Sequence, residues 1–170
     1  MNIEKIQSTI DEVKKPFILF LIGPPLSGKD TLLRSVELPD NVEIISRDQI
    51  VLDVWGSDDY DEAFKGVNQK QVDAELRNKF IDSNREKKSV IVNMTNMTKK
   101  RRVQTSNFFS DDYTKIAVIF PILEWEEYQR RNLKRQEEEK KFIPDRLIRS
   151  MISSYEPLTK EEGFDLIFTI

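Results

Sequence analysis

The 170-residue chain has a formal net charge of −3 at pH 7, and 34% of its residues are charged, which indicates a heavily ionised surface. It contains no cysteine and no histidine, which excludes disulfides, thiolate metal sites and histidine catalysis, so any proton transfer must use a carboxylate, Lys, Tyr or water. The longest apolar run, residues 17–22, is too short to span a membrane, and no secretory signal is evident, so we expect a cytoplasmic protein.

The predicted elements alternate between helices and short strands. We expect helices at residues 3–13, 29–36, a short one ending at 55, 62–87, 98–109, 124–138 and 144–155, and strands at 17–22, 42–46, 89–92, 116–120 and 165–170. Strands that are separated by helices indicate an α/β fold with a central parallel sheet flanked by helices. We expect a single domain over residues 1–170, with residues 1–15 as an N-terminal helical extension and about 124–150 as a helical lid region.

The apolar run continues into a glycine-containing loop, FILFLIGPPLSGKDT, over residues 17–31. This pattern is typical of a buried strand that leads into a phosphate-binding loop and a helix N-terminus, rather than of an ordinary connecting loop. Backbone N–H groups of such a loop bind a triphosphate, and Lys29 would contact its β- and γ-phosphates. The residues expected to bind the nucleotide are Gly23, Pro24, Pro25, Leu26, Ser27, Gly28, Lys29, Asp30 and Thr31.

Polar residues follow the second and third predicted strands, at the edge of the sheet where ligands bind in parallel α/β folds. Asp48 could accept a proton from an attacking hydroxyl, or it could cap the next helix. Arg47 would face the same edge and contact the substrate. Thr95 and Asn96 could orient a substrate or cap the helix that follows, and position alone slightly favours the cap.

Two arginines lie four residues apart on the predicted helix 124–138. Arg131 and Arg135 therefore emerge on one face of the helix, where both guanidinium groups could neutralise charge on a transferring phosphoryl group. The alternative is an exposed face on which they pair with Glu126, Glu127 or Glu139.

A basic cluster, Lys99-Lys100-Arg101-Arg102, begins the helix that Thr98 is predicted to cap. From this cluster we select Lys99 and Arg102 as candidates for binding a substrate phosphate. The alternative is a solvated basic helix end.

The chain resembles the 5′-kinase domain of polynucleotide kinases, within the small P-loop (Walker A) kinases. The resemblance covers residues 17–170 and depends on five elements in the family's order: GPPLSGKDT at 23–31, ISRD at 45–48, VIVNMTN at 90–96, RNLKR at 131–135, and a tail with IP at 143–144 and SYEPLTKEEGF at 154–164.

This resemblance implies a P-loop kinase fold with a helical lid and transfer of the γ-phosphate of ATP, with Mg²⁺, to a 5′-hydroxyl end of DNA or RNA. It also implies that Asp48 is the general base, that Lys29 binds the γ-phosphate, and that Arg131 and Arg135 are the lid arginines.

The chain departs from the family pattern at three places. Asp30 replaces the hydroxyl residue that usually helps to hold Mg²⁺, so Asp30 itself is our candidate metal ligand, directly or through water. Asn93 and Met94 stand where relatives carry an acid, and Val51 stands where phage polynucleotide kinases carry an arginine. Two other functions therefore remain open: a kinase of a nucleotide or other small alcohol, and a non-catalytic nucleotide-binding module.

Overall fold

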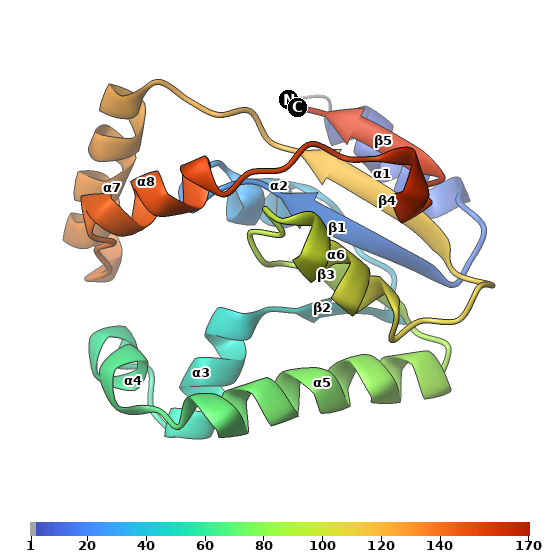
Figure 1. The fold of residues 1–170 in the computed structure, drawn as a ribbon, viewed down its shortest axis with the longest axis horizontal. Helices are drawn as coiled ribbons and strands as arrows, with labels where there is room; N and C mark the ends of the chain where they lie inside the picture. Colours follow the sequence, from blue (N-terminus) through green and yellow to red (C-terminus); the bar gives the residue numbers. More distant parts are fainter. Residues whose placement is uncertain (1–2) are drawn as a thin grey trace.

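All five strands of the central sheet are parallel, and their order is β2-β3-β1-β4-β5. The computed structural model describes residues 3–170, and the strands are β1 (Phe17–Ile22), β2 (Val42–Ile45), β3 (Ser89–Val92), β4 (Thr114–Ile119) and β5 (Leu166–Thr169). Each crossover between neighbouring strands contains helix or irregular chain, as a parallel sheet requires. The predicted α/β architecture is therefore confirmed (Figure 1).

The helices cover both faces of the sheet. They are α1 (Ile3–Glu12), α2 (Lys29–Ser35), α3 (Arg47–Trp55), α4 (Tyr60–Gly66), α5 (Gln69–Arg85), α6 (Lys99–Ser106), α7 (Trp125–Glu139), α8 (Asp145–Ser153) and the 3₁₀ helix η1 (Lys160–Glu162). None of the helices in residues 3–170 is long and apolar enough to cross a membrane. Residues 1 and 2, which belong to the predicted N-terminal extension, lie outside the described residues.

The central strand β1 divides the core into two layers. Ile18, Phe20 and Ile22 pack in the cluster that includes residues of α3, α4 and α5, whereas Phe17, Leu19 and Leu21 pack in the cluster that includes residues of α1 and α2. This alternation follows from the two-residue period of a strand. Since β1 is buried on both faces, it holds the loop that follows it at a fixed position on the edge of the sheet.

The predicted helix 62–87 is wrong as a single helix, because it is two helices that break at Val67 and Asn68. Asn68 has extended backbone angles, and its side chain accepts hydrogen bonds from the backbone N–H groups of Lys70 and Gln71 at 3.0 and 3.2 Å. Asn thus caps α5, as short polar side chains commonly do. The capping competes with the helical pattern of the surrounding sequence, and α4 ends at Gly66.

The carboxyl ends of the strands lie on the same side of the molecule as α3, α4, α7 and α8 (Figure 1). The predicted phosphate-binding loop follows β1 on this side, and α3 and α6 begin shortly after β2 and β3. Residues that are far apart in the sequence therefore meet at this edge.

Candidate functional site

The loop between β1 and α2 has the backbone that two glycines permit. A Cβ atom on Gly23 would lie 2.8 Å from both Phe120 Cβ and Ser27 Oγ, so only glycine fits there without displacement. Gly28 has a φ of 108°, in the left-handed region that favours glycine, and it lies at the N-cap position of α2. The Gly23 N–H also donates to the Thr95 carbonyl at 3.0 Å, which ties the loop to the segment after β3.

Lys29, the first residue of α2, folds back into this loop. Its Nζ donates to the carbonyl oxygens of Gly23 and Pro24 at 2.8 and 2.6 Å. Burial lowers the pKa of Lys29 to about 8, and the carboxylates of Asp30 and Asp48 oppose this effect. The ammonium is therefore held inside the loop in a poorly solvated position, where a phosphate would be a favourable counter-charge.

The remaining predicted loop residues lie between Gly23 and the first turn of α2. Residues 25–28 form the turn itself, within which Ser27 is buried, and Thr31 is exposed on the first turn of α2. The structure thus places the nine predicted nucleotide-binding residues in one continuous loop and helix start. Their contacts with a nucleotide stay a prediction.

Asp30, which replaces the usual hydroxyl residue of the loop, contacts Asn93, which stands where relatives carry an acid. Asn93 Nδ2, just past β3, donates a hydrogen bond of 3.0 Å to Asp30 Oδ1. Asp30 is exposed at the N-terminal end of α2 and is close enough to Lys29 to raise its pKa. The site therefore has one carboxylate at the position where the phosphates would enter, oriented by a neutral amide.

The single carboxylate fits a nucleotide-bound Mg²⁺ better than a metal held by protein alone. No group of three or more His, Cys, Asp or Glu side chains that could hold a metal occurs within residues 3–170. Mg²⁺ commonly keeps several waters and takes one or two carboxylates together with substrate phosphates. Asp30 and the adjacent loop match that donor set.

Asp48 lies on the first turn of α3, and it is not the cap of that helix. The cap is Ser46, whose side chain accepts from the backbone N–H of Gln49 at 3.4 Å. Desolvation by the surrounding protein raises the pKa of Asp48, while the positive charge of Arg135 opposes the rise. The capping alternative for Asp48 is therefore wrong, and its carboxylate lies within electrostatic reach of Arg135, Asp30 and Lys141.

The two arginines of α7 reach across to this edge. Arg131 Nη1 donates to the Leu26 carbonyl of the phosphate-binding loop at 2.9 Å, and its Nε donates to Glu127 Oε1 at 2.6 Å. Arg135 forms an ion pair with Glu139 at 3.4 Å, and its charge acts on both Lys29 and Asp48. Both arginines therefore pair with glutamates of their own helix, as the alternative interpretation expected. Arg131 in addition contacts the loop.

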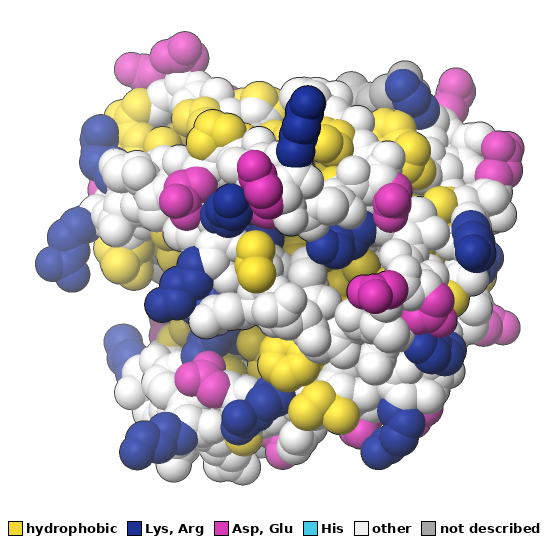
Figure 2. Space-filling view, turned by 45° about the vertical axis from the view of Figure 1, so that its right-hand side comes forward, with side chains coloured by type: hydrophobic (Ala, Val, Ile, Leu, Met, Phe, Trp, Pro, Cys, Tyr) yellow, Lys and Arg dark blue, Asp and Glu magenta, His cyan; other side chains and the backbone are white. Residues whose placement is uncertain are grey.

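Two residues that the sequence did not indicate, Tyr60 and Lys141, lie close to Arg135 and Asp48. The Tyr60 ring lies 5.0 Å from Lys141 Nζ and 5.9 Å from the guanidinium carbon of Arg135. Burial raises the pKa of Tyr60 to about 12, with a further contribution from the nearby Asp48 charge. Tyr60 begins α4 and Lys141 follows α7, so no local motif could have joined them. Figure 2 shows a hollow at the left of the molecule, with Lys and Arg side chains around it.

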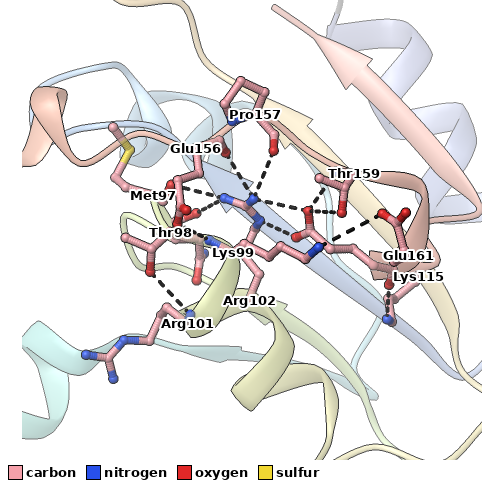
Figure 3. A network of polar contacts seen from close by, with 12 residues as sticks. Met97, Thr98, Lys99, Arg101, Arg102, Lys115, Glu156, Pro157, Thr159 and Glu161 are labelled. Carbon is pink, nitrogen blue, oxygen red and sulfur yellow. Dashed lines mark hydrogen bonds and ion pairs between the residues drawn. The ribbon is translucent and has the colours of Figure 1, made fainter.

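Arg102 is not available to a substrate, so its predicted role is wrong. Its side chain is 0% exposed and forms an ion pair with Glu162, with Nε 2.6 Å from Oε1 (Figure 3). It also donates to the carbonyls of Asn96, Met97 and Glu156 at 3.0, 3.1 and 3.0 Å. Arg102 therefore joins α6 to the C-terminal segment, which is a structural role.

Asn96 is likewise buried, which contradicts both interpretations of its side chain. Its Nδ2 donates to the carbonyls of Leu21, Val92 and Met94, the shortest at 2.7 Å. The cap of α6 is Thr98, as predicted, since its hydroxyl accepts from the Arg101 N–H at 3.3 Å. Asn96 instead fastens the segment after β3 to β1.

The other residues that were predicted to bind substrate, Arg47, Lys99 and Thr95, lie close to other residues of the protein. Arg47 Nη2 donates to Gln69 and Asp73 of α5 at 2.7 and 3.1 Å. Lys99 Nζ lies 4.0 Å from Glu161, and the Thr95 side chain is half-buried beside the loop. The structure therefore brings together Lys29, Asp30, Asp48, Arg131 and Arg135. It pairs Arg102 with Glu162, and Lys99 lies 4.0 Å from Glu161, both in the C-terminal segment.

The fold and the loop agree with a comparison to known families. A family model described as an AAA domain matches residues 18–158, which is most of the chain. The chain belongs to the AAA domain family. No curated protein sequence matches this AAA domain.

Solved structures share the fold of this AAA domain. A chain of the Pnkp1/Rnl/Hen1 RNA repair complex is 24% identical with a TM-score of 0.64, and the match covers 82% of this chain and 44% of that one. A chain of the PezAT toxin–antitoxin system of Streptococcus pneumoniae is 16% identical with a TM-score of 0.64, covering 98% and 73%. Kti12 of Chaetomium thermophilum, solved with ADP-AlF3, is 15% identical with a TM-score of 0.58, covering 90% and 88%.

These similarities show that this AAA domain has the fold of P-loop kinases. Its length corresponds to less than half of the matched chain in the RNA repair complex.

Proposed function

We propose that this AAA domain binds ATP with Mg²⁺ and transfers the γ-phosphate to the 5′-hydroxyl end of a polynucleotide. The observation that carries the proposal is the position of Asp48. Because Ser46 caps α3, the carboxylate of Asp48 is free, and it lies within electrostatic reach of both Lys29 and Arg135. A base, a phosphate ligand and an arginine thus converge at one edge of the sheet, as phosphoryl transfer requires.

In this mechanism the loop amides and Lys29 hold the β- and γ-phosphates in line with the acceptor. The acceptor hydroxyl gives its proton to Asp48 as its oxygen forms a bond to the γ-phosphorus, and the bond from that phosphorus to the bridging oxygen of ADP breaks. Arg131 and Arg135 neutralise the charge that spreads over the transferring group. Mg²⁺, held by Asp30 and the phosphates, would supply further charge neutralisation.

A raised pKa suits Asp48 for the role of general base. A carboxylate whose pKa is above its usual range holds a proton more strongly, so it accepts one more readily in the transition state. The positive charge of Arg135 favours the ionised carboxylate and so opposes the rise in the pKa of Asp48 that desolvation causes.

Three things support a polynucleotide as the acceptor rather than a small alcohol. The five motifs occur in the order found in polynucleotide kinase domains. A chain of an RNA repair complex has the same fold. The lid that we propose over about residues 124–150 reaches the loop from α7 through Arg131 and leaves the side of α5 and α6 uncovered.

A transfer assay tests the proposal. Purified protein is incubated with ATP labelled at the γ-phosphate, Mg²⁺, and either 5′-hydroxyl DNA or RNA oligonucleotides, mononucleotides, or small alcohols. We expect labelled oligonucleotides and no label with the Lys29→Ala variant. Label on mononucleotides or small alcohols alone would favour the small-molecule kinase, and ATP binding without transfer to any acceptor would favour a non-catalytic module.

A further inference from the structure

A groove of about 520 Å³ lies between α5 and α6. Its apolar lining includes Leu76, Phe80, Met94 and Phe108. Phe80 is buried and stacks on Phe108 with ring centroids 5.6 Å apart, while Phe108 is only half-buried. The partly exposed ring of Phe108 is therefore supported by the buried ring of Phe80. A flat ligand group could stack on the exposed side of Phe108.

Two arginines line this groove without partners. Arg77 of α5 and Arg101 of α6 are exposed, and within the described residues neither guanidinium group has a hydrogen bond or an ion pair. Figure 3 shows the Arg101 side chain pointing away from the network in which the neighbouring Arg102 is buried. The two cations are thus free to bind an anion.

The acidic side chain of the groove does not cancel these charges. Asp73 lines the groove, but it already pairs with Arg47 at 3.1 Å. A ligand in the groove would therefore meet a neutralised ion pair and two unneutralised guanidinium groups.

Two chain connections link the lining of the groove to residues of the candidate site. Arg47, the partner of Asp73, directly precedes Asp48. Met94, which lines the groove, directly follows Asn93, which is bonded to Asp30. A chain-like acceptor whose end reaches Asp48 would therefore extend toward the groove.

We propose that this groove binds the single-stranded segment behind the acceptor's 5′ end, with backbone phosphates on Arg77 and Arg101 and a base against Phe108. The inference rests on the proposed function and names the path of its substrate. Proteins that bind single strands combine cations that follow the backbone with aromatic rings on which bases stack, and this groove has both. Arg101, and not the predicted Arg102, would thus bind a substrate phosphate.

Charge reversal of the two arginines tests the groove. The affinity of single-stranded 5′-hydroxyl oligonucleotides, labelled at the 3′ end, is measured by fluorescence anisotropy at several salt concentrations. For Arg77→Glu/Arg101→Glu we expect Kd to rise by about tenfold or more at low salt. Because each phosphate contact on a single strand contributes a salt slope of about 0.7, the slope should fall by about 1.4. ATP affinity should not change.

Two further variants serve as controls. Lys14→Glu/Arg34→Glu changes the net charge equally at exposed positions on α2 and before β1, away from the groove, and should leave Kd within about twofold. Arg77→Lys/Arg101→Lys keeps the charge and should keep most of the salt slope. Equal weakening by the Lys14/Arg34 variant would overturn the proposal, because it would show that only the net charge matters.

The transfer assay separates failure of the groove from failure of the proposed function. A nucleoside 3′-monophosphate has no chain beyond its single phosphate to follow the groove, so Arg77→Glu/Arg101→Glu should phosphorylate it at the wild-type rate. If the wild-type protein phosphorylates oligonucleotides and the double variant binds them equally well, the groove inference is wrong and the function stands. If the wild-type protein neither binds nor phosphorylates oligonucleotides, both are wrong.

Discussion

Asn93 and Asp30 are joined by a hydrogen bond of 3.0 Å that links the end of β3 to the first turn of α2. In P-loop nucleotide hydrolases a loop Ser or Thr and a strand-end Asp together hold Mg²⁺. Here the carboxylate stands on the loop side and the neutral side chain on the strand side. Because the two residues touch, the exchange keeps one carboxylate at the same place in the site.

We therefore expect that the carboxylate can be moved back from position 30 to position 93 when both residues are changed together. Asp30→Ser should weaken Mg²⁺-dependent nucleotide binding by about tenfold, since it removes the carboxylate proposed to hold Mg²⁺, and Asp30→Ser/Asn93→Asp should restore much of it. Mn²⁺ titration followed by electron paramagnetic resonance, with ADP present, measures this without turnover. Additive losses in the double variant would show that the two positions do not share the metal.

Lys29 should make ATP binding sensitive to alkaline pH. The pKa of Lys29 in the free protein is about 8, and a bound triphosphate would favour the protonated form. As the pH rises above 8, the free protein loses this proton, so binding must take one up and Kd should rise by up to about tenfold per pH unit. Isothermal titration calorimetry in buffers of different ionisation enthalpy measures both quantities.

Lys29→Arg is the matched control for that experiment, because a guanidinium group stays charged throughout the accessible range. Its ATP affinity should be lower but independent of pH between 7 and about 9.5. A wild-type affinity that is equally flat would contradict the assignment.

Asp48→Asn should reduce turnover by about 10²–10⁴-fold and leave ATP binding nearly intact, because it keeps the shape and loses the basicity. The raised pKa of Asp48 predicts that wild-type turnover falls as the pH drops through that pKa, where the base becomes protonated. The variant should lose this acid limb. Rate measurements across pH test both points, and a variant within a few fold of wild type would assign the proton to another acceptor.

Ser46→Ala provides a contrast on the same turn. Removal of the cap should lower the free energy of unfolding by about 1 kcal/mol, whereas Asp48→Asn should not, because Asp48 does not cap the helix. Urea unfolding of the two variants compares them directly.

The arginines of α7 should act mainly in the transition state. Lysine keeps the charge but cannot reproduce the planar fork, so Arg131→Lys and Arg135→Lys should lower kcat more than they weaken ATP binding. Arg131 also holds the Leu26 carbonyl of the loop, so its variant should show the larger loss of ATP affinity of the two. Steady-state kinetics with separate ATP binding measurements make the comparison. Equal losses in both parameters would indicate ground-state binding alone.

Arg102 should matter for stability and not for substrate affinity. Arg102→Met leaves the Glu162 carboxylate buried without its cation, which should cost about 3–5 kcal/mol of unfolding free energy. Arg101→Met, the exposed neighbour, should change stability by at most about 0.5 kcal/mol. Chemical denaturation measures both. A stable Arg102→Met protein with a raised oligonucleotide KM would restore the original prediction.

The strands and the glycine-containing loop that follows β1 could be predicted from the sequence, because each depends on residues that are close in the chain. A buried strand followed by glycines and Lys29 is a local pattern, and β1 and β3 have the predicted bounds. The helix break at Asn68 was also local, but a capping side chain there competed with a helical pattern that continued on both sides.

The tertiary structure alone decided which cations of the basic cluster are free. Successive helix residues point about 100° apart, so Arg101 faces the groove while Arg102 enters the core. Which direction is buried depends on where Glu162, sixty positions later in the chain, comes to lie. The contact of Asn93 with Asp30, and that of Tyr60 with Lys141, are of the same kind. They depend on the meeting of strand ends and helices in space, and no spacing within the sequence encodes them.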